Sequence, residues 1–152
     1  MAGYAIFCYI MGVKDRHNGN IMIDREGHIF HIDFGFILDD SPRNLGFETA
    51  PFKITIDDID IMQGKDSEAF NLFKVLFFTG FKAVQKYKNE IINIIKYVVD
   101  DEDKIKKLND KFKSDFSEID LTNYINGLIY SSVDNFTTAQ YDNFQRLTNG
   151  IL

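Results

Sequence analysis

The strongest constraint on the fold lies in the second half of the chain, where apolar residues recur at helical spacing from Asp66 or Ser67 onward. Intervals of three or four residues place side chains on one face of an α-helix. The first such stripe consists of Phe70, Phe73, Phe77, Phe81 and Val84. We interpret this stripe as part of a hydrophobic core rather than as a ligand site.

Four further segments show the same spacing. Residues 91–98, 105–112 and 121–129 each place apolar side chains on one helical face, and residues 136–152 form a last amphipathic stretch. With its 152 residues the chain suits a single domain. The pattern predicts an α+β domain that is mainly α.

The first part of the chain predicts shorter elements. Apolar residues at helical spacing stop at Gly12, which indicates a helix end. Residues 20–24 and 29–33 read as two strands of a hairpin, joined by a four-residue loop at 25–28. Thr55 with Asp58 predicts a capping box at the start of a short helix.

Charge and cysteine content exclude several classes of protein. The formal net charge of −6 argues against binding to nucleic acid through a basic surface. Cys8 is the single cysteine, so an intrachain disulfide is impossible and a reducing compartment fits best. The sequence contains neither a signal-peptide pattern nor an apolar run long enough to cross a bilayer.

The predicted hairpin suggests a cation site. With a four-residue loop, Asn20 would lie opposite Asp33, and residues directly opposite have Cβ atoms about 4.5–5.5 Å apart. An amide oxygen and a carboxylate at that separation suit Mg²⁺, which is completed by water and phosphate oxygens. We therefore expect the hairpin to carry a metal site.

The residues around the hairpin extend this chemistry. Asp15 and His17 precede Asn20, and either side chain is a candidate to accept a hydroxyl proton. Asp33-Phe34-Gly35 follows the second predicted strand. An Asp-Phe-Gly motif with an Asp and an Asn upstream of it, here Asp15 and Asn20, is typical of the metal-binding half of phosphoryl-transfer sites. The irregular stretch at residues 34–52 is long enough to be a functional loop.

These motifs resemble the phosphatidylinositol 3- and 4-kinase family. The resemblance rests on GVKDRHNGNIMID and HIFHIDFGFIL, in which the order Asp15-Arg16-His17 reverses that of ordinary protein kinases. Within the family the chain is most similar to the type III beta phosphatidylinositol 4-kinases. Four features carry that similarity: Lys14, Phe36, SPRNLGFETAPFKIT and FQRLTNGIL.

The resemblance implies roles for the residues near the hairpin. Asn20 and Asp33 would hold Mg²⁺, or Mn²⁺, on the phosphates of ATP, and Ile32 would lie in the ATP site. His17 or Asp15 would accept the proton of the inositol hydroxyl; His17 is favoured because imidazole titrates near neutral pH.

The resemblance also implies roles around the catalytic loop. Arg16 would brace this loop, and Lys14 would stabilise charge near the transferring phosphate or contact the lipid head group. The activation loop would recognise phosphatidylinositol through Phe36, Arg43, Phe47, Phe52 and Lys53. The last helix would either pack on another lobe or touch the membrane through Phe144, Leu147, Ile151 and Leu152.

The implied activity is transfer of the γ-phosphate of ATP to the 4-hydroxyl of phosphatidylinositol. The enzyme would act from the cytoplasm as a peripheral protein on internal, Golgi-like membranes. Residues 1–152 would form the C-terminal lobe of the catalytic domain, because a glycine-rich phosphate loop and a strand lysine are absent from the sequence. We expect the N-terminal lobe to be a required partner and the isolated C-lobe to be inactive.

Three alternatives remain at this point. Two belong to the same family: a phosphatidylinositol 3-kinase and a related protein kinase, both of which Lys14, Phe36 and the segment SPRNLGFE disfavour. The third is a non-catalytic adaptor that retains this lobe to bind a membrane or a protein. The complete set Asp15, His17, Asn20 and Asp33 argues against the adaptor.

Overall fold

The structure is a computed structural model that describes residues 1–40, 49–133 and 135–150. Within these residues helices dominate, and they are accompanied by one two-stranded antiparallel sheet. The elements in chain order are α1 (Ala2–Met11), η1 (Asn18–Asn20), β1 (Ile21–Ile23), β2 (Ile29–His31), α2 (Ile56–Ile61), α3 (Glu68–Lys86), α4 (Lys88–Lys96), α5 (Glu102–Lys111), α6 (Glu118–Val133) and α7 (Phe136–Asn149). The predicted mainly helical α+β class is confirmed, as are the helices expected in the second half of the chain.

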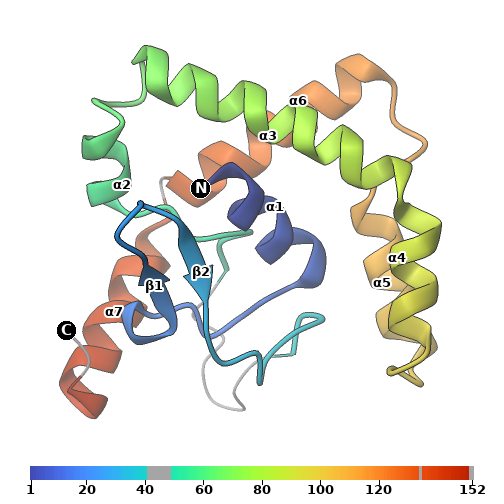
Figure 1. Ribbon diagram of the computed structural model, residues 1–152, viewed down its shortest axis with the longest axis horizontal. Coiled ribbons are helices and arrows are strands. Elements are labelled where there is room, and N and C mark those ends of the chain that lie inside the picture. The colour runs from blue at the N-terminus through green and yellow to red at the C-terminus, as the bar shows by residue number, and fades with distance from the viewer. Residues whose placement is uncertain (41–48, 134, 151–152) are drawn as a thin grey trace.

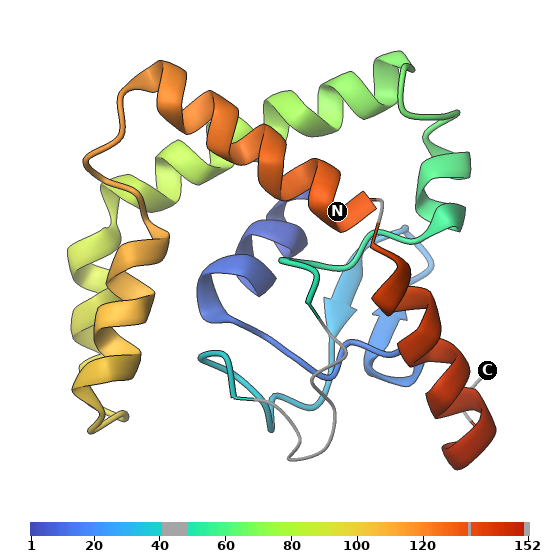
Figure 2. The same cartoon turned by 180° about the vertical axis from the view of Figure 1, so that it is seen from behind.

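The helices place the hairpin at one side of the molecule. Helix α3 crosses the full width of the domain, with α6 behind it, and α1 lies beneath both (Figure 1). The antiparallel pair α4 and α5 descends from one end of α3, whereas the hairpin and α7 lie together on the opposite side (Figures 1 and 2). The C-terminal helix is thus a neighbour of the hairpin in space although more than 100 residues separate them.

The core forms where α1, α3 and α6 meet. On α3 the predicted stripe is buried, with Phe70, Phe77 and Phe81 fully enclosed and Val84 partly buried at its end. Gly80 permits the close approach of α1, since a Cβ there would lie 2.7 Å from Ile6 Cδ1. Burial of aromatic side chains is a major stabilising contribution in such a core. No helix of the described residues is long and apolar enough to span a membrane.

The helix ends follow the sequence signals. Helix α1 ends at Gly12, which adopts a left-handed conformation with φ 58°. Thr55 caps α2 in a reciprocal capping box with Asp58, and Ser67 caps α3 by accepting a hydrogen bond from the amide of Phe70. These three predicted boundaries are confirmed.

The hairpin is present, but its predicted register is wrong by one residue. Ile21 lies opposite His31, and the amide of Ile32 donates to the carbonyl of Asn20 at 2.9 Å. Asn20 therefore pairs with Ile32 and not with Asp33. A shift of one residue exchanges the two faces of a strand, so the predicted shared face of Asn20 and Asp33 within the sheet is not formed.

The shorter connecting loop explains this register. The amide of Asp24 donates to the carbonyl of His28 at 3.0 Å, which leaves a loop of three residues, 25–27. Gly27, at φ 85°, supplies the left-handed residue that such loops favour. The Asp24 carboxylate accepts hydrogen bonds from the amides of Glu26 and His28, and the bonds from His28 lower the pKa of this carboxyl.

Candidate active site

The loop between α1 and β1 folds around Asp15. This residue adopts φ 62°, an uncommon conformation that aspartate and asparagine tolerate better than most side chains. The side-chain amide of Asn20 donates to the carbonyl of Asp15 at 3.0 Å and lies 3.4 Å from its Oδ2. Asn20 is buried, and its amide oxygen faces away from Asp15 because its nitrogen makes these contacts.

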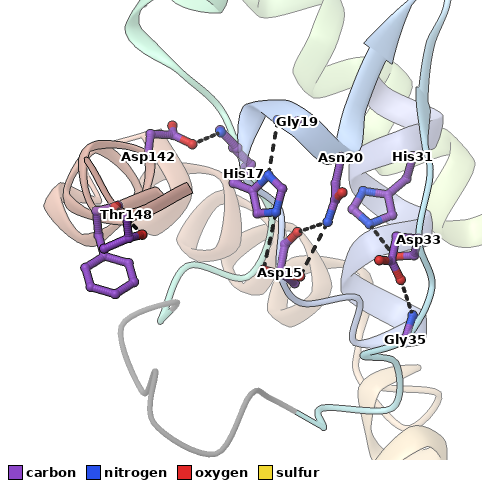
Figure 3. Close-up of polar contacts among 11 residues, drawn as sticks. Asp15, His17, Gly19, Asn20, His31, Asp33, Gly35, Asp142 and Thr148 are labelled. Carbon is purple, nitrogen blue, oxygen red and sulfur yellow. Dashed lines mark hydrogen bonds and ion pairs between the residues drawn. The ribbon is translucent and has the colours of Figure 1, made fainter. Parts of the chain in front are cut away.

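His17 is oriented by the turn that follows it. Its Nδ1 accepts a hydrogen bond from the amide of Gly19 at 3.1 Å, and its carbonyl accepts one from the amide of Asn20 at 2.9 Å. Because Nδ1 accepts, the proton of a neutral ring lies on Nε2. Nε2 faces Asp15 Oδ1 at 3.7 Å, which is beyond hydrogen-bond length. Figure 3 shows the two side chains side by side.

Asp33 is held at the end of β2 by its own neighbours. It adopts φ 65°, which turns the chain out of the strand, and its Oδ1 accepts a hydrogen bond from the amide of Gly35 at 3.0 Å. His31 supports this turn, because its Nε2 lies 3.1 Å from the carbonyl of Asp33 and its Nδ1 lies 3.1 Å from the hydroxyl of Tyr4 on α1. Both ring nitrogens of His31 are therefore engaged.

Asn20 and Asp33 lie on the same edge of the domain despite the register shift. The carbonyl of Asn20 pairs with the residue directly before Asp33, and Figure 3 shows both side chains flanking His31. One amide oxygen and one carboxylate are hard donors of the type that Mg²⁺ accepts alongside phosphate and water. No group of three or more His, Cys, Asp or Glu side chains able to hold a metal occurs among the described residues. A pair of one amide oxygen and one carboxylate fits a cation that would be shared with a phosphate ligand.

Arg16 and Lys14 connect the loop at residues 13–17 to segments that lie further along the chain. Arg16 is buried, and its guanidinium donates to the carbonyl of Ala50 at 2.7 Å. This hydrogen bond joins the loop to residues 49–55, which is compatible with the bracing role expected for Arg16. The backbone amide of Lys14 donates to the carbonyl of Phe36 at 2.9 Å, and the Lys14 side chain is half-buried. Phe36 is likewise half-buried.

The other residues predicted for ATP or substrate contact lie in different surroundings. Ile32 is exposed on the hairpin. Arg43 and Phe47 lie outside the described residues, as do Ile151 and Leu152, whereas Phe144 and Leu147 on α7 are exposed.

Phe52 and Lys53 do not lie at the surface. Phe52 is fully enclosed against Phe77, with ring centroids 5.1 Å apart, so its position argues against direct contact with lipid. The Lys53 ammonium is buried and donates to Asn18 and Asp142.

The structure also brings in residues that sequence reasoning did not select. Two ion pairs hold the segment after Gly35 against α5: Lys111 contacts Asp39 at 2.7 Å and Lys104 contacts Asp40 at 2.6 Å. Tyr4, Asn18 and Asp142 likewise contact site residues. The sequence around these residues does not reveal their contacts, because each contact is made with a residue far away in the chain.

Comparison with known proteins identifies the family of the chain. Residues 1–103 match the family described as phosphatidylinositol 3- and 4-kinase, and the chain belongs to that family. It is 43% identical over 159 aligned positions to phosphatidylinositol 4-kinase beta of Homo sapiens and of Sorex araneus, covering 99% of this chain and 20% of each relative. The protein of the same name from Danio rerio is also 43% identical, with 99% and 19% covered. The chain thus spans about a fifth of the length of these relatives.

Proposed function

We propose that this chain forms the metal-binding and activation-loop lobe of a phosphatidylinositol 4-kinase. The reaction is transfer of the γ-phosphate of ATP to the 4-hydroxyl of phosphatidylinositol at the cytosolic face of an internal, Golgi-like membrane. The observation that carries the proposal is the placement of Asp15, His17, Asn20 and Asp33 on one edge of the domain. The names of the similar proteins support the 4-kinase assignment.

Two residues would hold the cation on the phosphates of ATP. Asn20 presents its amide oxygen, because its amide nitrogen is turned to Asp15, and Asp33 presents its carboxylate. Bound Mg²⁺ or Mn²⁺ would supply charge neutralisation for the transferring phosphoryl group. Ile32, which pairs with Asn20 and directly precedes Asp33, would contact ATP from its exposed position.

The hydrogen-bond pattern favours Asp15 over His17 as the acceptor of the inositol proton. A base needs an unprotonated atom directed at the hydroxyl. His17 Nδ1 already accepts from Gly19, and its Nε2 carries the proton of the neutral ring. The Asp15 carboxylate offers acceptor oxygens and lies beside His17 Nε2. In this arrangement the N–H at His17 Nε2 would donate a hydrogen bond to the transferring phosphate.

Lys14 and the activation loop would bind the lipid head group. Lys14 directly precedes Asp15, and its backbone is paired with Phe36 at the start of the loop. Phe36 and Arg43 remain our proposed contacts with phosphatidylinositol, together with Phe47. The burial of Phe52 and Lys53 removes these two residues from the proposed lipid surface.

The test uses the longest natural polypeptide that includes residues 1–152, here called the full polypeptide. It would be incubated with ATP and Mg²⁺ and either phosphatidylinositol vesicles or a peptide, and the position of the new phosphate would be determined. Asp33→Asn tests the metal site, and Asp57→Asn, an exposed acid on α2, is the matched control. We expect phosphate on the inositol 4-hydroxyl, lost in Asp33→Asn and retained in Asp57→Asn.

Other products would point to the alternatives. Phosphate on the inositol 3-hydroxyl would make the protein a 3-kinase, and phosphorylation of the peptide alone would make it a protein kinase relative. Vesicle binding without any phosphorylated product from folded protein would favour an adaptor. Activity of residues 1–152 alone would contradict the expected need for an N-terminal lobe.

A further inference from the structure

A buried lysine joins the C-terminal helix to the catalytic loop. The ammonium of Lys53 donates to Asn18 Oδ1 at 2.8 Å and to Asp142 Oδ1 at 2.7 Å. The side chain of Lys53 is 3% exposed and that of Asp142 is 22% exposed. Asn18 is the first residue of η1 and directly follows His17, whereas Asp142 lies within α7. Three segments far apart in the sequence therefore meet at one ammonium group.

The burial of the lysine makes this junction sensitive to the position of α7. A charged ammonium removed from water requires partners, and loss of one partner leaves part of its charge uncompensated. Lys53 enters the interior beside Phe52, which is fully enclosed and whose amide donates to the hydroxyl of Ser132 at 3.3 Å. The burial and the hydrogen bond of the neighbouring Phe52 hold the backbone in place at Lys53. We therefore expect Lys53 to stay behind when α7 moves outward. A displaced α7 would withdraw Asp142 from the ammonium.

The junction acts on a short turn that carries two site residues. Only a single turn, η1, connects Asn18 to Asn20. It is closed by the hydrogen bonds from Gly19 to the His17 ring and from Asn20 to the His17 carbonyl. An additional bond at Asn18 fixes the outer side of this turn. Figure 3 shows Asp142 next to the loop that carries His17.

We propose that Lys53 is a positioning residue for phosphoryl transfer, which makes the geometry of the catalytic loop depend on the docking of α7. Lys53 holds Asn18, Asn18 fixes the turn that presents His17 and Asn20, and Asp142 holds Lys53 in place. The inference rests on the proposed kinase function of the same site. Small displacements of such groups matter, because misplacement by about 1 Å lowers a rate by roughly a hundredfold.

The test compares Lys53→Met, Asp142→Asn and the double variant in the full polypeptide. Lys53→Met removes the charge and keeps most of the side-chain length, and Asp142→Asn changes one partly exposed carboxylate into an amide. Lys82→Met is the matched control, since Lys82 faces Glu118 at 3.9 Å in an exposed pair between α3 and α6. The readouts are kcat, the KM values for ATP and phosphatidylinositol, and hydrogen exchange of the Gly19 and Asn20 amides.

A positioning role predicts a selective loss of kcat. We expect kcat to fall about tenfold or more in Lys53→Met and less in Asp142→Asn, with both KM values within about threefold of the wild type. The double variant should be no slower than Lys53→Met alone, because both changes break one chain of contacts. The Gly19 and Asn20 amides should exchange faster in all three variants, and Lys82→Met should match the wild type.

Several outcomes would overturn the proposal. It fails if kcat stays within about twofold of the wild type in both single variants, or if their effects on kcat multiply in the double variant. Unchanged exchange at Gly19 and Asn20 would overturn it as well. If Lys53→Met does not fold, Asp142→Asn alone decides through the same readouts. A wild-type protein without lipid product would refute the proposed kinase, while the exchange data would still decide whether α7 is coupled to the catalytic loop.

Discussion

The proposed catalytic edge, residues 12–40, and the helical core of α1, α3 and α6 are ordered in different ways. At this edge Asp15, Asp33, Leu38 and Asp39 all adopt positive φ, and hydrogen bonds between side chains and backbone fix the turns. The core is fixed by burial, with successive phenylalanine rings on α3 in stacked or edge-to-face contact at centroid distances near 6 Å. Substitutions at the edge should therefore change chemistry with little effect on stability, and substitutions in the core should do the opposite.

The largest effect on chemistry is expected for Asp33→Asn. Asparagine tolerates φ 65° and can still accept the Gly35 amide bond, so the fold of the turn is kept. Loss of the proposed metal-binding carboxylate should lower kcat by on the order of 10⁴-fold, or ~5.5 kcal/mol. Thermal unfolding measures whether stability is kept, and the lipid kinase assay measures the loss of kcat. A variant with more than a tenth of the wild-type kcat would refute the role of Asp33.

The largest effect on stability is expected for Phe77→Ala. Phe77 is fully enclosed and contacts Phe52, Phe73 and Phe81. The cavity should lower the free energy of unfolding by about 3–5 kcal/mol, measured by chemical denaturation. Leu72→Ala on the exposed side of the same helix should change it by no more than about 0.5 kcal/mol. Equal losses in the two variants would contradict the assigned packing of α3.

The assignment of the proton acceptor predicts an intermediate effect. Asp15→Asn keeps the positive φ and should lower kcat about a hundredfold, or ~2.7 kcal/mol. His17→Asn can still accept the Gly19 amide bond through its side-chain oxygen and should lower kcat only about tenfold. Steady-state kinetics on phosphatidylinositol vesicles separates the two. A larger loss in His17→Asn would make His17 the acceptor.

Gly12→Ala tests the junction between the two regions. Gly12 ends α1 at φ 58°, and a Cβ there would lie 2.6 Å from the backbone nitrogen of Asp39. The left-handed conformation alone should lower the free energy of unfolding by about 1–2 kcal/mol. Gly127→Ala is the matched control, because open space surrounds that position in α6 and alanine favours a helix. Denaturant unfolding should show opposite signs for the two variants; loss of stability in both would contradict the prediction.

The smallest effect is confined to alkaline pH. Burial and the hydrogen bond with Tyr124 raise the pKa of the Tyr9 phenol well above its ordinary value. The folded state therefore keeps this proton, whereas the unfolded chain releases it near pH 10, so stability is lost as pH rises above about 10. Tyr9→Phe should flatten this decline in unfolding experiments. Tyr97→Phe, which changes a side chain that is 91% exposed, should leave the decline unchanged.

Much of the fold could be predicted from the sequence because its signals are local. Helical spacing revealed α3 to α7, Gly12 and Ser67 marked helix ends, and Thr55 with Asp58 formed the expected capping box. The hairpin was found as well, but its loop length was not. The observed register goes with a three-residue loop in which Gly27 is left-handed, and the spacing of the residues alone did not distinguish this loop from one of four residues.

Some residues of the candidate site could likewise be selected from the sequence, whereas the surroundings of others could not be predicted. Asp15, His17, Asn20 and Asp33 could be selected from the sequence, since their short spacing is itself the family motif. The environments of Phe52 and Lys53 could not be predicted, because an aromatic residue and a lysine in a long loop give no indication of burial. The position of Phe52 depends on the helical core, and that of Lys53 depends on α7.

The sequence by itself determined the mainly helical class of fold, several helix boundaries and the choice of residues proposed to carry the chemistry. Each of these depends on residues within a few positions of one another, through helical periodicity, capping and motif spacing. The tertiary structure alone decided the strand register, the burial of Phe52 and the partners of Lys53. Asp142 lies 89 positions from Lys53, and Ser132 lies 80 positions from Phe52. Only the packing of α6 and α7 against the first half of the chain brings these groups together.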